Sequence, residues 1–114
     1  MTVIFKIAHA AEWAAAERDG AFAGSEKDRA DGFLHFSTAP QLAETLRRYY
    51  AGANDLLLIA VEESALGAAL KYEHAVSRGE DFPHLYRALP VSAVTWVRTI
   101  GRAPDGTAIL PPLT

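Results

Sequence analysis

Three apolar stretches rich in β-forming side chains predict the main strands of this chain. The first runs from Thr2 to Ala8, the second is the unbroken apolar run Asp55–Glu62, and the third covers Val94–Ile100. β-Branched and aromatic residues favour strands, and an apolar run without alternation indicates a strand covered on both faces. We therefore expect Asp55–Glu62 to be a central strand and Val94–Ile100 to be the last strand.

Two segments between these strands have helical features. Ala10–Arg18 is rich in alanine and is followed by Gly20, while the segment that begins with the capping-box pattern Thr38-Ala39-Pro40-Gln41 is followed by Gly52. The second segment has apolar residues at helical spacing, which predicts a buried face. The residues of that face are Leu42, Leu46, Tyr49 and Tyr50.

The remaining segments give shorter patterns. Ala21–Ala30 is polar without periodicity and is expected to be a loop, and Gly32–Phe36 is expected to be a strand. Leu70–His74 alternates like a half-buried strand, with Leu70, Tyr72 and His74 on one face. Phe82–Arg87 contains a proline, which argues against a central strand and favours an edge strand or a loop. Together these elements predict an α+β fold with a mixed or antiparallel sheet and two main helices.

Length and composition narrow the class of protein. With 114 residues, 50% of them hydrophobic and 22% charged, the chain is expected to form a compact single domain over residues 1–114. A net charge of −3 with scattered basic residues disfavours nucleic acid and membrane partners and favours a small-molecule ligand or a protein partner. No cysteine, basic leader or membrane-spanning apolar run is present, so we expect a cytoplasmic protein. The oligomeric state is not determined by these features.

The junction between the strand Gly32–Phe36 and the second helix carries the first candidate site. Alternation places His35 and Ser37 on one face, next to a helix N-terminus that attracts anions. A ligand hydroxyl or phosphate bound between them is one interpretation. The alternative is that Thr38 and Gln41 already satisfy the helix N–H groups and that His35 is a hydrogen-bonded core residue.

A second candidate site lies in Phe82–Arg87, where an extended backbone aligns His84 with Tyr86. An acid–base group beside an aromatic hydroxyl would form a ligand wall, whereas the alternative is a loop with a solvated His84. Glu73 is the third candidate, and an exposed ion pair with Lys71 is its alternative interpretation. Although the chain has four histidines, none has the spacing of a metal site, so no metal is expected.

Several of these residues resemble a known family. Asp31-Gly32-Phe33-Leu34-His35-Phe36-Ser37-Thr38, Gln41, Tyr49 and Phe82-Pro83-His84-Leu85-Tyr86 are similar to small bacterial and plant proteins catalogued as domain of unknown function 952, over nearly the whole chain. The resemblance implies a compact ADP-ribosylation-like fold, the split and mostly antiparallel sheet of enzymes that bind NAD and transfer ADP-ribose. His35-Phe36-Ser37 matches the His-x-Ser pattern that binds the ribose of NAD in such enzymes.

The resemblance leaves part of that site without a counterpart. A tyrosine that stacks on nicotinamide would be Tyr49, Tyr50 or Tyr86, and the catalytic glutamate has no match because Val94–Ile100 contains no acid. Three functions therefore remain open. They are a site for NAD, ADP-ribose or a related nucleotide, an acid–base enzyme that uses His35 and His84, and a binding module with structural histidines.

Overall fold

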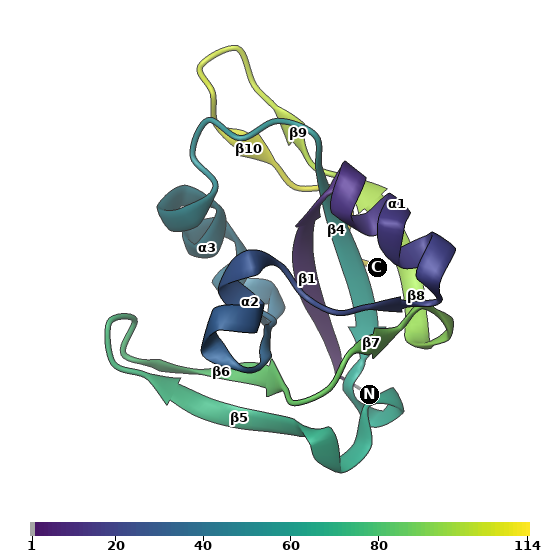
Figure 1. The fold of residues 1–114 in the computed structure, drawn as a ribbon. Helices are drawn as coiled ribbons and strands as arrows, with labels where there is room; N and C mark the ends of the chain where they lie inside the picture. Colours follow the sequence, from purple (N-terminus) through teal and green to yellow (C-terminus); the bar gives the residue numbers. More distant parts are fainter. Residues whose placement is uncertain (1) are drawn as a thin grey trace.

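Two three-stranded antiparallel sheets carry most of the structure (Figure 1). The chain is represented by a computed structural model, which describes residues 2–114. The first sheet has the order β1-β4-β8, with β1 Val3–His9, β4 Leu56–Glu62 and β8 Val94–Thr99. The second has the order β3-β6-β5, with β3 Leu34–His35, β6 Glu80–Leu85 and β5 Leu70–Ala75. Two short antiparallel pairs are added by β2 Ala21–Phe22 with β7 Leu89–Pro90 and by β9 Gly101–Arg102 with β10 Ala108–Ile109.

Among residues 2–114, one isolated backbone bridge joins the first sheet to the segment that follows β3. Phe5 of β1 and Ser37, just beyond β3, exchange two backbone hydrogen bonds, each with an N–O distance of 2.8 Å. This contact brings the outer edge of β1 against the segment that leaves β3. The line along which the two sheets meet is called the seam below.

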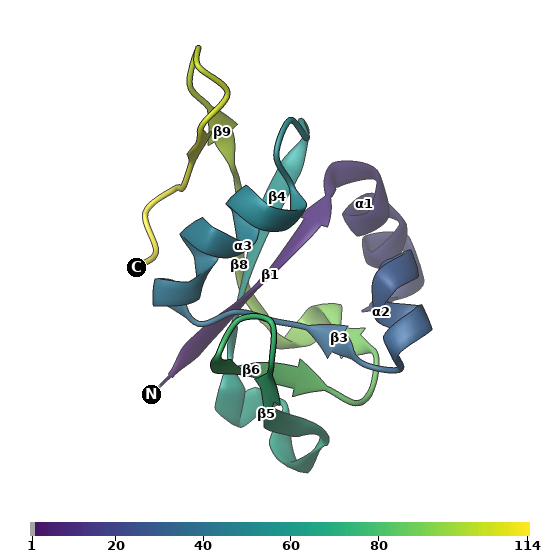
Figure 2. The same cartoon turned by 90° about the vertical axis from the view of Figure 1, so that its left-hand side faces the viewer.

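Helices cover both faces of the first sheet (Figure 2). On one face, α1 Ala10–Asp19 packs Trp13 and Ala16 into a buried cluster that includes Ile59 and Val61 of β4. On the other, α3 Leu42–Tyr49 packs Leu42 and Leu46 against Leu56, Leu58 and Ala60. Alternate residues of β4 therefore enter two different cores, as expected for a strand covered on both faces. The 3₁₀ turn Ala39–Gln41 leads into α3, and further 3₁₀ turns occupy Glu63–Ala65, Gly67–Ala69 and Val91–Ala93.

The predicted α+β class with antiparallel sheets is confirmed, as is the central position of the apolar run in β4. The radius of gyration is 13.3 Å, the value expected for a compact domain of this length. Within residues 2–114, no helix has the length and apolar character needed to cross a membrane.

The prediction of a loop at Ala21–Ala30 is wrong. This segment contains β2 and most of an additional helix that was not predicted, α2 Glu26–Asp31. Ser25 begins this helix with a capping box, in which the Asp28 N–H donates to Ser25 Oγ at 3.2 Å and the Ser25 N–H donates to Asp28 Oδ2 at 2.9 Å. Gly32 ends the helix with φ of 86°, so the strand predicted from Gly32 is shortened to Leu34–His35.

The expectation of an edge strand or loop at Phe82–Arg87 is also wrong, because β6 is the middle strand of its sheet. Pro83 is tolerated there for a geometric reason. Its carbonyl accepts a hydrogen bond from the Phe36 N–H at 3.0 Å, so its nitrogen faces the same side, where β3 has already ended. The lost N–H donor therefore breaks no bond with β5.

Three further details differ from the predictions. In β5, Tyr72 is exposed, whereas Glu73 lies on the other face, where its carboxylate contacts His84 of the neighbouring strand β6. Tyr49 is 53% exposed because α3 ends there, and Tyr50 instead packs against the second core. β8 is not the last strand, since the hairpin β9–β10 follows it.

Candidate functional site

A cavity of about 350 Å³ lies along the seam. Its wall combines side chains from β1, α2, the segment around β3, α3 and the β5–β6 hairpin. They include imidazoles, aromatic rings, hydroxyls and charged groups, namely His35, His74, His84, Phe33, Phe36, Tyr49, Tyr50, Phe82, Ser25, Ser37, Thr45, Lys6, Lys27, Arg78 and Asp28. A volume of this size is sufficient for a small-molecule ligand.

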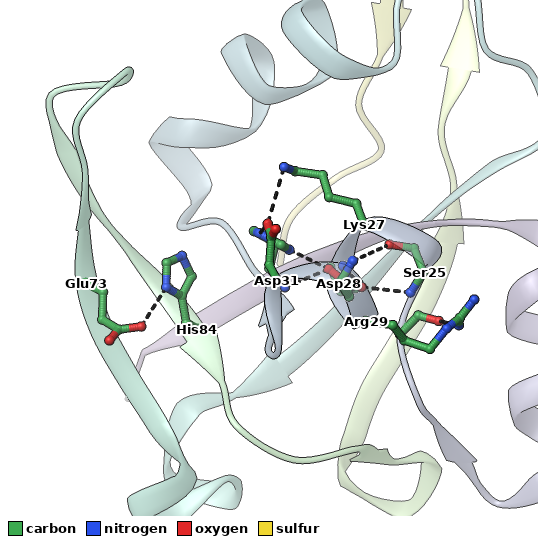
Figure 3. A network of polar contacts seen from close by, with 10 residues as sticks. Ser25, Lys27, Asp28, Arg29, Asp31, Glu73 and His84 are labelled. Carbon is green, nitrogen blue, oxygen red and sulfur yellow. Dashed lines mark hydrogen bonds and ion pairs between the residues drawn. The ribbon is translucent and has the colours of Figure 1, made fainter.

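Asp28 is the centre of a buried charge network on one wall of the cavity. Its Oδ2 atom lies 2.8 Å from Lys6 Nζ and accepts the Ser25 N–H. Its Oδ1 atom lies 2.5 Å from His35 Nδ1 and accepts the His35 N–H at 3.1 Å. Four donors thus surround one carboxylate that is only 2% exposed, and Figure 3 shows the part of this network on α2. The network ties α2 to β1 and β3.

Burial and neighbouring charges have opposite effects on the pKa values of Asp28 and Lys6. Burial raises the pKa of Asp28, but the hydrogen bond from His35 and the Lys6 ammonium outweigh it and hold that pKa well below its usual range. Burial lowers the pKa of Lys6, and the nearby Asp28 only partly reverses this effect. The carboxylate is therefore ionised at neutral pH, and its charge is compensated inside the protein.

His35 is held at both ring nitrogens. Nδ1 contacts Asp28, and Nε2 lies 2.9 Å from Asp31 Oδ2 at the end of α2. Both ring nitrogens thus face carboxylates of the chain, and these contacts fix the orientation of the ring in the wall of the cavity.

His84, the cross-strand neighbour of His35, has a different environment. Its Nδ1 lies 2.8 Å from Glu73 Oε1, and the same oxygen accepts the Tyr86 O–H at 2.6 Å. Figure 3 shows Glu73 and His84 pointing toward one another. The Tyr86 hydrogen bond, followed by the His84 contact, lowers the pKa of Glu73, so the carboxylate acts as the acceptor. Within residues 2–114, His84 Nε2 has no hydrogen-bond partner, and His84 lines the cavity.

Phe33 packs the two histidines together. Its ring stacks on His84 with a centroid distance of 4.0 Å and lies 4.6 Å from His35 and 5.3 Å from Tyr86. The two imidazoles meet edge to face at 5.6 Å, because His35 and His84 are paired across β3 and β6. This cluster fixes the ring planes and gives the cavity an aromatic wall.

The opposite side of the cavity is formed by α3 and the tip of the β5–β6 hairpin. Ser37 Oγ lies 3.3 Å from Thr45 Oγ1, and Arg78 in the hairpin donates to the same Thr45 atom at 3.1 Å. Tyr50 also lines the cavity, and burial, aided by the negative charges of Asp28 and Glu12, raises its pKa to about 12. Its phenol therefore stays protonated and can donate a hydrogen bond.

The structure brings together some of the candidate residues and leaves others outside the cavity. His35, Ser37, Tyr49 and His84 line it, whereas Thr38, Gln41, Glu73 and Tyr86 do not. Gln41 is used structurally, since its Oε1 accepts the Thr38 N–H at 3.0 Å and its Nε2 donates to the Asp81 carbonyl at 2.8 Å. The expected ion pair of Glu73 with Lys71 is wrong, because Glu73 accepts from His84 and Tyr86 instead. The solvated His84 of the loop alternative is likewise wrong, since only 9% of this residue is exposed.

Sequence reasoning missed three of the residues that shape the cavity, Lys6, Asp28 and Arg78. A lysine inside the apolar strand Val3–His9 is a signal for a buried partner, and Ser25-x-x-Asp28 is a capping pattern. Arg78 has no such signal, because only the fold of the hairpin brings it to α3. No group of three or more His, Asp or Glu side chains among residues 2–114 is placed to hold a metal ion.

Comparison with known proteins identifies relatives over most of the chain. The model of a family described as "Protein of unknown function (DUF952)" matches residues 7–97. The crystal structure of protein CC0527 from Caulobacter crescentus is 45% identical, with a TM-score of 0.89, and the match covers 94% of this chain and 93% of that one. The solution NMR structure of CC0527 is also 45% identical, with a TM-score of 0.84 and coverage of 96% and 92%. No curated protein matches the chain.

Proposed function

The chain belongs to the DUF952 family of proteins of unknown function, and from the geometry of its cavity we propose that it binds a small anionic ligand of the nucleotide class. NAD, ADP-ribose and related nucleotides are the candidates. The observation that carries this proposal is the convergence of His35, His84, Ser37 and the tyrosines of α3 on one cavity. Nucleotides need this combination of aromatic surface, hydroxyl groups and positive charge.

The likeness to the ADP-ribosylation fold is part of the same proposal. It is supported by the split antiparallel sheets and by the placement of His35 and Ser37, from the His-x-Ser pattern, on one cavity. The residues fit one nucleotide unit, with rings for stacking and Ser37, Thr45 and Arg78 for polar groups. NAD contains two such units, so a cavity of about 350 Å³ would hold one and leave the other at its mouth.

Calorimetric titration with AMP, ADP-ribose and NAD tests this function. We expect saturable binding of at least one ligand, and loss of that binding in His84→Ala at a temperature where circular dichroism shows the variant to be folded. His9→Ala is the matched control, because His9 does not line the cavity. The absence of heat and of thermal shift with all three ligands at millimolar concentration would overturn the proposal.

The second candidate function is acid–base catalysis on a bound small metabolite, and the contact between Glu73 and His84 favours it. A carboxylate that holds Nδ1–H leaves Nε2 as the proton acceptor, which is the arrangement of a general base. His35 and His84 also face the same cavity, as such chemistry requires. His35, however, is bound by two aspartates, so the proton-transfer role falls to His84 alone. The third hypothesis, a binding module, retains His35 as a structural residue.

Nitrogen-15 NMR of the His84 ring tests the second candidate. We expect the neutral ring to carry its hydrogen on Nδ1, and Glu73→Ala to shift the hydrogen to Nε2, since the acceptor is removed. Glu63→Ala is the control, because Glu63 bonds Tyr72 on the exposed face of β5. A ring that carries its hydrogen on Nε2 in the unaltered protein would exclude this role for the pair.

A further inference from the structure

Arg78 is a cation at the cavity without an acidic partner. Among residues 2–114, no carboxylate lies within 4.0 Å of its guanidinium, whereas the other two cations of the wall are paired. Lys6 contacts Asp28 at 2.8 Å and Lys27 contacts Asp31 at 3.3 Å. A half-buried charge is normally compensated. The positive charge of Arg78 is therefore available for an anion from outside the chain.

The surroundings of Arg78 hold its guanidinium in place. Nη1 donates to Thr45 Oγ1 at 3.1 Å, Nη2 donates to the Gln41 carbonyl at 3.5 Å, and the guanidinium lies 4.5 Å from the centre of the Phe82 ring. These contacts occupy two of its five N–H groups. The hairpin tip that carries Arg78 is itself attached to α3, because Arg48 donates to the Ser77 carbonyl at 3.4 Å.

Two hydroxyl groups lie beside this cation. Ser37, which is 5% exposed, and Thr45 have oxygens 3.3 Å apart, and both residues line the cavity with Arg78. A guanidinium and neighbouring hydroxyls are the donors that commonly bind phosphate oxygens. The hydroxyls can rotate to donate to an anion, because their hydrogens are not fixed by the backbone.

We infer that Arg78, Ser37 and Thr45 form a subsite for a phosphate group of the nucleotide ligand. This inference rests on the proposed ligand site and specifies which end of the ligand is bound where. Phe82, under Arg78, and His84 are two residues apart on β6, so they share a face about 7 Å apart. A phosphate at Arg78 therefore places the next polar group of the ligand, a ribose or sugar hydroxyl, toward His84.

Binding of AMP and adenosine to the unaltered protein and to Arg78→Gln provides the test. We expect AMP to bind about tenfold or more tightly than adenosine, and Arg78→Gln to remove that difference while adenosine binding stays the same. Arg47→Gln is the matched control, since it removes a charge from the exposed side of α3 outside the cavity. Equal losses for AMP and adenosine in Arg78→Gln, or an unchanged preference for AMP, would overturn the subsite.

Inorganic phosphate separates a failure of the subsite from a failure of the nucleotide proposal. If neither AMP nor adenosine binds, the nucleotide function fails, and phosphate is titrated while the backbone amide shifts of Ser37, Thr45 and Arg78 are followed by NMR. Saturable shifts that are lost in Arg78→Gln and in Thr45→Val support the subsite, and no saturable shift overturns it. Thr45→Val also serves if Arg78→Gln does not fold.

Discussion

At the scale of single residues, Asp28 has the largest structural role at the cavity. Its two oxygens accept from Lys6, Ser25 and His35, so one side chain connects β1, α2 and β3. Both members of the Lys6–Asp28 pair are almost fully buried. Removal of one partner from such a pair leaves an uncompensated buried charge, which is more harmful than loss of both.

We predict that Asp28→Asn lowers the free energy of unfolding by about 3–5 kcal/mol, because Lys6 then loses its counter-charge. The double variant Lys6→Met with Asp28→Asn should recover part of that loss. Urea denaturation followed by circular dichroism measures both changes. A single variant that is as stable as the double variant would contradict the stranded-charge explanation.

The depressed pKa of Asp28 also predicts a dependence of stability on pH. The carboxyl pKa is lower in the folded state than the ordinary value of 3.8, so the contribution is fully present above about pH 4. It is lost as the pH falls from there toward the folded pKa, since the unfolded chain then binds the proton first. The carboxyl carbon shift of Asp28, followed by NMR from pH 6 to the acid transition, should show no titration while the protein stays folded. Titration of this carboxyl near the ordinary pKa of an aspartate in the folded protein would contradict the prediction.

Sequence reasoning located His35 and His84 of the cavity but not their environments. His35 and His84 lie in strand-like motifs where alternation indicates a shared face, and both line the cavity. Alternation could not reveal that Asp28 and Asp31 occupy both nitrogens of His35, because these aspartates belong to a helix that the pattern does not predict. Arg78 is brought to Thr45 across 33 positions of the chain, which no local pattern encodes.

At the scale of elements, α2 shows why short helices are missed. Its six residues, Glu26–Asp31, include no large apolar side chain, so they have no hydrophobic period to detect. The helix is instead defined by its Ser25 cap and by the buried Asp28. By contrast, α3 has Leu42 and Leu46 at helical spacing, and it was predicted correctly for that reason.

Just before α2, the backbone at Gly24 passes close to the side chains of Leu34 and Asp28. Its φ is 110°, and a Cβ atom there would lie 2.7 Å from Leu34 Cδ2 and 2.8 Å from Asp28 Cβ. We predict that Gly24→Ala destabilises the protein by about 1–3 kcal/mol more than Gly32→Ala, through this overpacking. Gly32, at the other end of the same helix, has φ of 86° but open space around its Cβ position, so it isolates the backbone effect. Thermal denaturation of the two variants measures the difference, and equal losses would refute the overpacking explanation.

At the scale of the whole molecule, two hydrophobic clusters pack on opposite faces of β4, and β1 contributes to both. Ile59 and Val61 of β4 pack in the cluster of α1, while Leu56, Leu58 and Ala60 pack in the cluster of α3. The unbroken apolar run predicted this double burial. The sequence does not predict that β6 lies between β3 and β5. A proline is tolerated in this middle strand because β3 ends before it would need a hydrogen bond from the Pro83 nitrogen.

The shared strand predicts that both clusters unfold together, although they lie on opposite faces of a sheet. Each cluster has one tryptophan. Trp13 is buried in the cluster of α1, whereas Trp96 packs against the cluster of α3, and the centre of its ring lies 5.9 Å from that of Phe5. Trp13→Phe and Trp96→Phe therefore give two single-tryptophan proteins, each reporting on one cluster. In each variant, we expect tryptophan fluorescence and far-ultraviolet circular dichroism to give the same urea midpoint. Each cluster loses the packed side chains of β4 when that strand unfolds, so neither cluster can remain folded alone. A fluorescence midpoint below the circular dichroism midpoint in either variant would show that its cluster unfolds alone and that β4 does not couple the two.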